Sequence, residues 1–246
     1  AAPAGRYAGL FHFALLVPER ADLARWLAHA ARERVPLAGM SDHFVSEAIY
    51  LTDPDGHGIE IYHDRPREVW EGQVATRLVT EPLDVGSLLR ELDDPARAPF
   101  DGLPAGTDMG HVHLQVADVR ESIGFYRDVV GFALMAELMG SAAFLGAGGY
   151  HHHIGLNTWE SSGGTAPSPG TTGLYHLAIR YPTRAALGDA LRRLDEAGVT
   201  LDGASDHGVS EALYLRDPDG NGIELYWDRP KESWPRADDG TKFEKM

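Results

Sequence analysis

The alternation of apolar and polar residues predicts the same β-α-β-β-β unit near both ends of the chain. Short β-type runs at residues 12–17 and 176–180 open the two copies. Helical spacing of apolar residues follows in ADLARWLAHAARERV and RAALGDALRRLDEAGV. Each copy then closes with strand-like runs, the last two joined by Asp-Pro-Asp-Gly. In that sequence Asp and Pro favour the start of a turn and Gly supplies a positive φ.

The closing parts of the two copies are nearly identical in sequence. GMSDHFVSEAIYLTDPDGHGIEIYHDRP (39–66) and GASDHGVSEALYLRDPDGNGIELYWDRP (203–230) agree at 21 of 28 positions, with an offset of 164 residues. The same offset, without a gap, superimposes His12 on His176 and Glu60 on Glu224. Self-similarity of this kind indicates that one ancestral unit was copied.

A third and more diverged unit is predicted between the copies, in residues 109–159. MGHVHLQV alternates as a strand, DVRESIGFYRDVVGF is an amphipathic helix with Gly131 near its end, and SAAFLGAG and YHHHIGLNTW are later strands. Residues 161–172 are a Gly/Ser/Pro-rich linker. The expected fold class is therefore α+β, with repeated β-α-β-β-β units that form two modules of curled mixed sheets with helices outside.

The order of the units predicts four segments. Residues 1–66 are the second half of an N-terminal module, 67–108 a connecting segment, 109–230 a C-terminal catalytic module of two units, and 231–246 a tail. A lone unit in the first module would leave its sheet face uncovered. Residues Ala1–Gly9 resemble the end of a linker, and we therefore expect the first unit of that module to be missing ahead of Ala1.

Composition narrows the function. The 22 Lys and Arg against 37 Asp and Glu give a formal charge of -15, which repels phosphate backbones and anionic lipid and argues against nucleic acid and membrane partners. No apolar run approaches about 18 residues, so a cytoplasmic protein is expected.

A homo-oligomer is expected from exposed sheet edges. Without cysteine, a metal site would have to use histidine and carboxylate ligands.

Three residues are the first candidates for such a site. His111 and His176 each open the first strand of a unit, and Glu224 lies on a final strand. Two histidines and one carboxylate are the set used by non-haem Fe(II) oxygenases. Glu224 stands in the apolar run GIELY, where a buried carboxylate calls for a cation opposite it. Strand parity leaves His113 as an alternative to His111, since both face the same side.

Other candidates surround this set. Tyr214 and His207 precede Glu224 and are suited to hydrogen bonding and proton transfer, with a packed Tyr and a loop His as the alternative interpretation. In the run His151 to His153 at most two rings share a face, and one of them could act as an acid or base.

The first copy repeats the candidate set. Its members are His12, His43, Tyr50 and Glu60. The set would form a second metal site if a third ligand were supplied. We expect a vestigial site instead, because the first copy has no such ligand of its own.

The units and the run H-x5-L-Y-x2-D-P-D-G-x3-E, which ends at Glu224, resemble the vicinal oxygen chelate superfamily. Within it they resemble type I extradiol ring-cleaving dioxygenases of the catechol-2,3-dioxygenase kind. The resemblance covers nearly all of the chain except 67–108 and the part after Pro230. It implies His111, which follows a glycine, with His176 and Glu224 as metal ligands. Ser205 is a minor departure from the family pattern.

The resemblance also implies an activity. Tyr214 and His207 would line the active site, and the acid/base histidine matches His153 best, with His152 one residue away. The implied reaction is extradiol (meta) cleavage of a catechol-type substrate with O2 at Fe(II), and Mn(II) accepts the same ligands.

Two other functions occur on the same scaffold. A glyoxalase-type isomerase or lyase with Ni(II) or Zn(II) usually recruits a second carboxylate, which YHHHIGLN lacks. A metal-free drug-binding protein would not need the His/His/Glu set.

Overall fold

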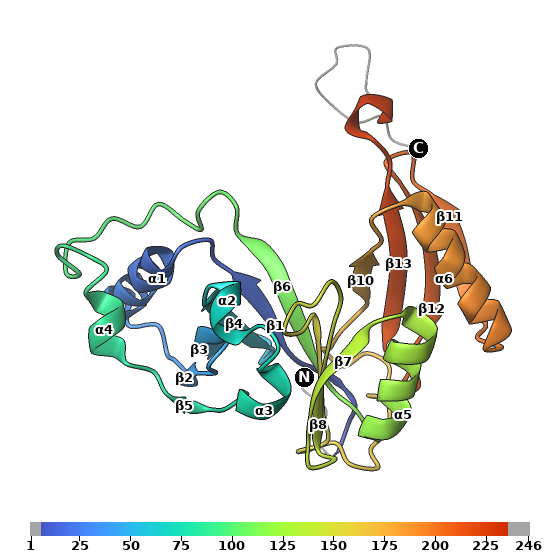
Figure 1. Cartoon of the computed structure of the whole chain (residues 1–246), viewed down its shortest axis with the longest axis horizontal. Coiled ribbons are helices and arrows are strands. Elements are labelled where there is room, and N and C mark those ends of the chain that lie inside the picture. Colours follow the sequence, from blue (N-terminus) through green and yellow to red (C-terminus); the bar gives the residue numbers. More distant parts are fainter. Residues whose placement is uncertain (1–5, 236–246) are drawn as a thin grey trace. The chain divides into compact units, whose positions relative to one another are not determined.

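The computed structural model describes residues 6–235, and the chain divides into two compact units (Figure 1). The first unit comprises Ala1–Val119 and Ala133–Gly173, and the second comprises Arg120–Phe132 and Leu174–Met246. The early part of the stretch Ala1–Gly9, expected to be a linker, lies outside the described residues, as does most of the expected tail.

One mixed, curled sheet forms the first unit, in the order β5-β2-β3-β4-β1-β6-β9-β8-β7. The first repeat and the middle repeat each contribute four strands, and the connecting segment adds one short strand at the edge. The strands are β1 (Gly9–Leu16), β2 (Gly39–Asp42), β3 (Ser46–Thr52), β4 (Gly58–Asp64), β5 (Glu81–Pro82), β6 (Asp108–Gln115), β7 (Ala133–Leu138), β8 (Ala142–Gly146) and β9 (Ile154–Asn157).

The centre of this sheet is the antiparallel pair β1 and β6, the first strands of two repeats. β1 is parallel to β4 on its other side, and β6 is parallel to β9. In this register Ala14 lies opposite Glu60 on β4 and opposite His111 on β6. Directly opposed residues point to the same face of a sheet, so side chains from three strands meet on one face.

Helix α1 (Arg20–Glu33) forms because its apolar residues recur at helical spacing. Leu23 and Leu27 are buried in one core cluster with Ile49 and Ile61 of the sheet. Arg34, with a φ of 57°, takes the left-handed conformation that ends the helix. The connecting segment adds three short helices, α2 (Arg67–Trp70), α3 (Val74–Arg77) and α4 (Val85–Leu89).

A four-stranded sheet in the order β10-β13-β12-β11 forms the second unit. The Thr183 side chain accepts a hydrogen bond from the Ala186 amide at the start of its long helix. The Tyr126 hydroxyl donates to Asp217 within the unit, at 2.9 Å. Its elements are α5 (Val119–Gly124, which begins at the boundary), the π-helical segment η1 (Phe125–Val130), β10 (Leu177–Arg180), α6 (Arg184–Glu196), β11 (Leu201–Asp206), β12 (Ser210–Arg216), β13 (Gly222–Asp228) and the 3-10 turn η2 (Lys231–Ser233).

The α+β class, the β-α-β-β-β order and the Asp-Pro-Asp-Gly turns are confirmed. The strand at residues 133–138 was not predicted, because FALMAEL does not alternate cleanly. The middle repeat contributes to both units: β6 pairs with β1 of the first repeat, and residues 120–132 belong to the unit of the last repeat. The expected division into modules stays a prediction. The expected further unit ahead of Ala1 stays a prediction.

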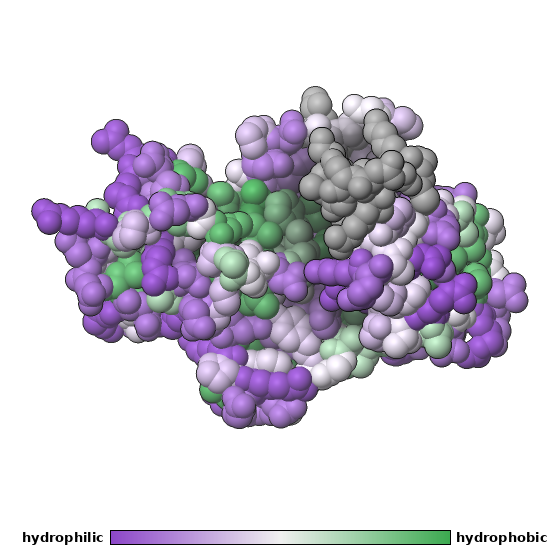
Figure 2. Space-filling model, turned by 90° about the horizontal axis from the view of Figure 1, so that it is seen from above, coloured by the Kyte–Doolittle hydropathy of each residue, from purple (hydrophilic) through white to green (hydrophobic). Residues whose placement is uncertain are grey.

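Hydrophilic residues predominate on the face shown in Figure 2, in keeping with a formal charge of -15. None of the helices within residues 6–235 is long and apolar enough to cross a membrane. The cytoplasmic location and the homo-oligomer stay predictions.

Candidate metal centre

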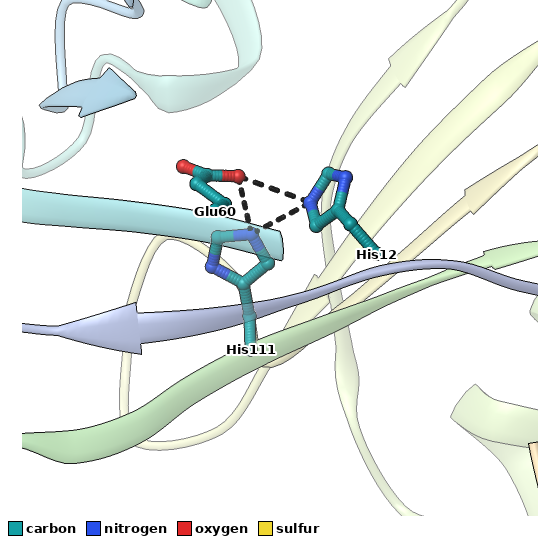
Figure 3. A group of neighbouring side chains, drawn as sticks. All are labelled: His12, Glu60 and His111. Atoms are coloured by element: carbon teal, nitrogen blue, oxygen red, sulfur yellow. Dashed lines mark hydrogen bonds and ion pairs between the residues drawn. The ribbon is translucent and has the colours of Figure 1, made fainter. Parts of the chain in front are cut away.

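Three buried side chains from β1, β4 and β6 converge on one face of the nine-stranded sheet (Figure 3). His12 Nε2 lies 3.0 Å from Glu60 Oε2, and His111 Nε2 lies 3.1 Å from the same oxygen. The two Nε2 atoms are 3.2 Å apart. Figure 3 shows the three side chains pointing toward one another from their separate strands.

Two glycines allow this approach. A Cβ at Gly58, opposite His12 in the β1–β4 pair, would collide with the Phe11 carbonyl oxygen. A Cβ at Gly110, next to His111, would collide with the Tyr62 hydroxyl. Glycine is required at both positions because another strand or a large ring comes close to the backbone.

The spacing of the three ligand atoms fits a divalent metal. Ligands about 2.1 Å from a metal and at right angles to one another stand about 3 Å apart, which matches the three separations in the centre. In residues 6–235 this is the only group of three or more potential ligand side chains that lie so close together.

Burial and close charge partners shift the pKa values of the residues in the centre. Glu60 is only 2 % exposed, and burial alone would raise its pKa, yet the charge and hydrogen bonds of His111 and His12 hold that pKa well below the usual range. A carboxylate so deeply buried needs a cation opposite it. Burial lowers the pKa of His111 despite the opposing effect of Glu60, which favours the neutral ring that a metal ligand requires.

Tyr50 and His43 support Glu60 from β3 and the loop before it. His43 Nδ1 lies 2.8 Å from the Val79 carbonyl, which can only accept, so Nδ1 carries the hydrogen. His43 Nε2, 2.7 Å from the Tyr50 hydroxyl, therefore accepts from it. Burial, followed by the charge of Glu60, raises the pKa of Tyr50 well above its usual value. Tyr50 is thus a protonated hydroxyl beside the centre.

The middle repeat supplies the other side of the centre. His113 is buried and its ring centroid lies 5.0 Å from that of His12, but His111 is the histidine whose nitrogen joins the ligand group. The ring of His152 lies 4.2 Å from that of His111, between centroids. His153, the expected acid/base, accepts a hydrogen bond from the Ala147 amide instead, and its ring lies against Tyr150.

The last repeat holds the corresponding pair in the second unit. His176 Nε2 lies 3.1 Å from Glu224 Oε2, and the Tyr214 hydroxyl donates to Glu224 at 3.1 Å. His207 Nε2 lies 2.8 Å from that hydroxyl. The His176 side chain is 36 % exposed, so this pair is much more open than its copy.

The residues expected from the sequence to form one metal site belong to both units, and that set stays a prediction. His111 is grouped with His12 and Glu60, whereas His176 and Glu224 pair with each other in the second unit. The first copy was expected to lack a third ligand, and the structure places His111 beside His12 and Glu60, where it could serve as one. The duplication in the sequence had already indicated His12 and Glu60 as candidate ligands. Their proximity to His111 depends on the pairing of β1 with β6, which the sequence does not reveal.

Comparison with known proteins identifies the family of the chain. The sequence model of the Glyoxalase/Bleomycin resistance protein/Dioxygenase superfamily matches residues 1–61 and 108–225. A catechol-2,3-dioxygenase of Bacillus subtilis (strain 168) is 40 % identical over 197 residues, which cover 79 % of this chain and 68 % of that protein. Biphenyl-2,3-diol 1,2-dioxygenase 3 of Rhodococcus globerulus is 34 % identical over 128 residues, covering 51 % of this chain and 67 % of that protein.

A solved structure shares the fold. A candidate dioxygenase from Bacillus subtilis aligns with a TM-score of 0.59 at 17 % identity, over 92 % of this chain and 66 % of that one. The chain thus spans about two thirds of the length of these relatives. The match of the family model over most of the sequence, together with the identity to the Bacillus subtilis protein, shows that the chain belongs to the Glyoxalase/Bleomycin resistance protein/Dioxygenase superfamily.

Proposed function

We propose that this chain is an extradiol dioxygenase that opens the ring of a catechol-type substrate with O2. Its metal would be Fe(II), held by His12, Glu60 and His111. The observation that carries the proposal is the convergence of two histidine nitrogens and one carboxylate oxygen in a buried site. The names of the relatives, which act on catechol and biphenyl-2,3-diol, support the substrate class.

The donor set suits this chemistry. Two histidines and one carboxylate leave about three coordination positions open, enough for both oxygens of a diol and for O2. Bound Fe(II) would supply chelation of the diol and electron transfer between substrate and O2. Mn(II) accepts the same ligands, so the choice of Fe(II) is part of the proposal.

The surrounding residues would control protons and water. Tyr50 would accept a hydrogen bond from a hydroxyl of the bound diol, because its own hydrogen is donated to His43. The exposed fractions of His12, Glu60 and His111 are 6, 2 and 4 %, so bulk water has little access to the reacting atoms. These roles are those expected from the sequence for Tyr214 and His207, transferred to the copy in which the third ligand is present.

Anaerobic loading with Fe(II), followed by catechol and O2, tests the proposal. The expected result is a yellow ring-opened semialdehyde that absorbs in the visible range. Glu60→Ala should abolish its formation, and Glu224→Ala, the matched change in the last repeat, should retain it. Loss of the product in Glu224→Ala with retention in Glu60→Ala would contradict the assignment. No product from the metal-loaded parent protein would contradict the activity itself.

A further inference from the structure

A buried hydrogen-bonded chain runs from Asp64, at the end of β4, to the ring beside His111. Asp64 Oδ1 lies 2.8 Å from His151 Nε2. His151 Nδ1 lies 2.8 Å from His152 Nδ1. The ring of His152 then lies against that of His111. His151 is fully buried and His152 is 7 % exposed, so water is not an alternative partner for most of this chain.

The order of donors along the chain follows from Asp64. An ionised carboxylate can only accept, so His151 Nε2 carries a hydrogen. With one hydrogen on each ring, His151 Nδ1 has a lone pair and must accept from His152. The hydrogen of His152 is then on Nδ1, and its Nε2 has a lone pair. Among the described residues, His152 Nε2 has no hydrogen-bond partner.

We infer that Asp64, acting through His151, is a positioning residue that fixes His152 in the Nδ1–H tautomer. His152 thereby presents an acceptor nitrogen beside the centre of His12, Glu60 and His111. A hydroxyl of a diol bound at that centre would donate to this nitrogen. The link to the diol rests on the proposed function, whereas the tautomer does not.

A second branch from Asp64 ends beside the same ligand. The Tyr150 hydroxyl donates to Asp64 Oδ2 at 2.8 Å. Tyr62 lies 2.8 Å from that hydroxyl and donates to it, since the hydrogen of Tyr150 is already engaged. The Tyr62 ring lies 5.0 Å from that of His111, between centroids. Both carboxylate oxygens are thus used, and each holds a separate branch.

The two branches make Asp64→Asn informative. An amide has one oxygen and one NH2 group, so it cannot accept from His151 and Tyr150 at the same time. If its NH2 faces His151, that ring must accept at Nε2 and donate at Nδ1. The hydrogen of His152 then moves to Nε2. We expect a shift of the tautomer population of His152 away from Nδ1–H.

Long-range 1H–15N NMR of the histidine rings measures this directly, on the metal-free full chain at one fixed neutral pH. Spectra of His151→Gln and His152→Gln assign the signals. The expected result for the parent protein is a hydrogen on Nδ1 of His152 and none on Nε2. A predominant Nε2–H form of His152 in the parent protein would overturn the inference, and this measurement needs no folded variant of Asp64.

Two variants serve as controls. Asp228 occupies the position of Asp64 in the last repeat and pairs with Arg180 at 3.5 Å, so Asp228→Asn should leave the His152 signals unchanged. Tyr62→Phe shortens the second branch and should also preserve the tautomer. An unchanged tautomer in a folded Asp64→Ala protein, which offers neither branch an acceptor, would refute the positioning role.

Activity gives a second readout. For Asp64→Asn we expect kcat to fall about 10- to 100-fold, the usual effect of losing a residue that orients a functional group. KM should change little. An inactive parent protein with the Nδ1–H tautomer would refute the proposed function and leave this inference standing.

Discussion

The Glu60 carboxylate lies 3.1 Å from the imidazole of His111, although 51 residues separate them in the chain. The two residues belong to different repeats. They are in contact because only one strand, β1, lies between β4 and β6 in the sheet. The centre is therefore a property of the pairing between two repeats. Four predictions test the centre and the stability of the fold that holds it.

The choice between the two histidines of β6 can be tested by parallel substitutions. His111→Gln should weaken metal binding by more than about 100-fold. Changing a residue that only orients a metal ligand typically weakens binding about 10- to 100-fold, and loss of the ligand itself should cost more. His113→Gln should weaken it less than about 10-fold, because His113 packs on His12 without joining the ligand group. Isothermal titration with Fe(II) under argon measures both, and the reverse order of effects would assign the ligand to His113.

Gly110→Ala should destabilise the protein by about 1–3 kcal/mol, the usual result of forcing an extra group into a packed site. The new Cβ would meet the Tyr62 hydroxyl. Gly39→Ala is the control, because a Cβ there meets nothing within 4 Å. Urea unfolding gives both values, and Tyr62→Phe added to Gly110→Ala should recover part of the loss. Equal stability of the two single variants would show that β6 is not packed in this way.

Asp42→Asn should make the free energy of unfolding less dependent on pH in the acid range. The hydrogen bond from Arg65 lowers the pKa of Asp42, with nitrogen to oxygen distances of 2.6 Å. A lowered pKa in the folded state contributes stability above the unfolded pKa of about 3.9, and this contribution is lost as pH falls through the folded value. We expect a loss of about 0.5–1 kcal/mol at pH 7 for this partly exposed pair.

Thermal unfolding of the Asp42→Asn variant and the parent between pH 2 and pH 7 gives the comparison. The two proteins should converge at the acid end. A difference that persists unchanged at pH 2 would mean that the carboxyl group contributes through shape and not through charge.

Tyr50→Phe should lower kcat about 2- to 10-fold, the effect of losing one neutral hydrogen bond. Tyr214→Phe, its counterpart in the last repeat, should leave turnover of catechol within about twofold of the parent. Steady-state rates on the iron-loaded proteins measure both. A larger loss in Tyr214→Phe would return the active site to the last repeat.

Much of the fold could be predicted because the repeat is local in sequence. The spacing of Leu23 and Leu27, the Asp-Pro-Asp-Gly turns and the alternation in β6 each depend on neighbouring residues alone. The pairing of β1 with β6 could not be predicted, since two repeats can meet in several ways that leave every local pattern unchanged. Chain order favoured grouping the middle repeat with the last one, and the register of Ala14 with His111 shows that its first strand also pairs with the first repeat.

The candidate centre was predictable by residue type and less so by position. Chemistry required two histidines and a carboxylate, and the duplication marked the positions of His12 and Glu60 as well as those of His176 and Glu224. Selecting between the copies needed the burial of each pair, which depends on distant strands. The acid/base position was also ambiguous, because parity fails in the turn before β9, where His152 and His153 stand.

Anomalous scattering at the iron edge, on crystals of the Fe(II)-loaded protein, tests the central claim most directly. A strong peak within bonding distance of His12, Glu60 and His111 is the predicted result. A peak beside His176 and Glu224, with none at Glu60, would contradict it.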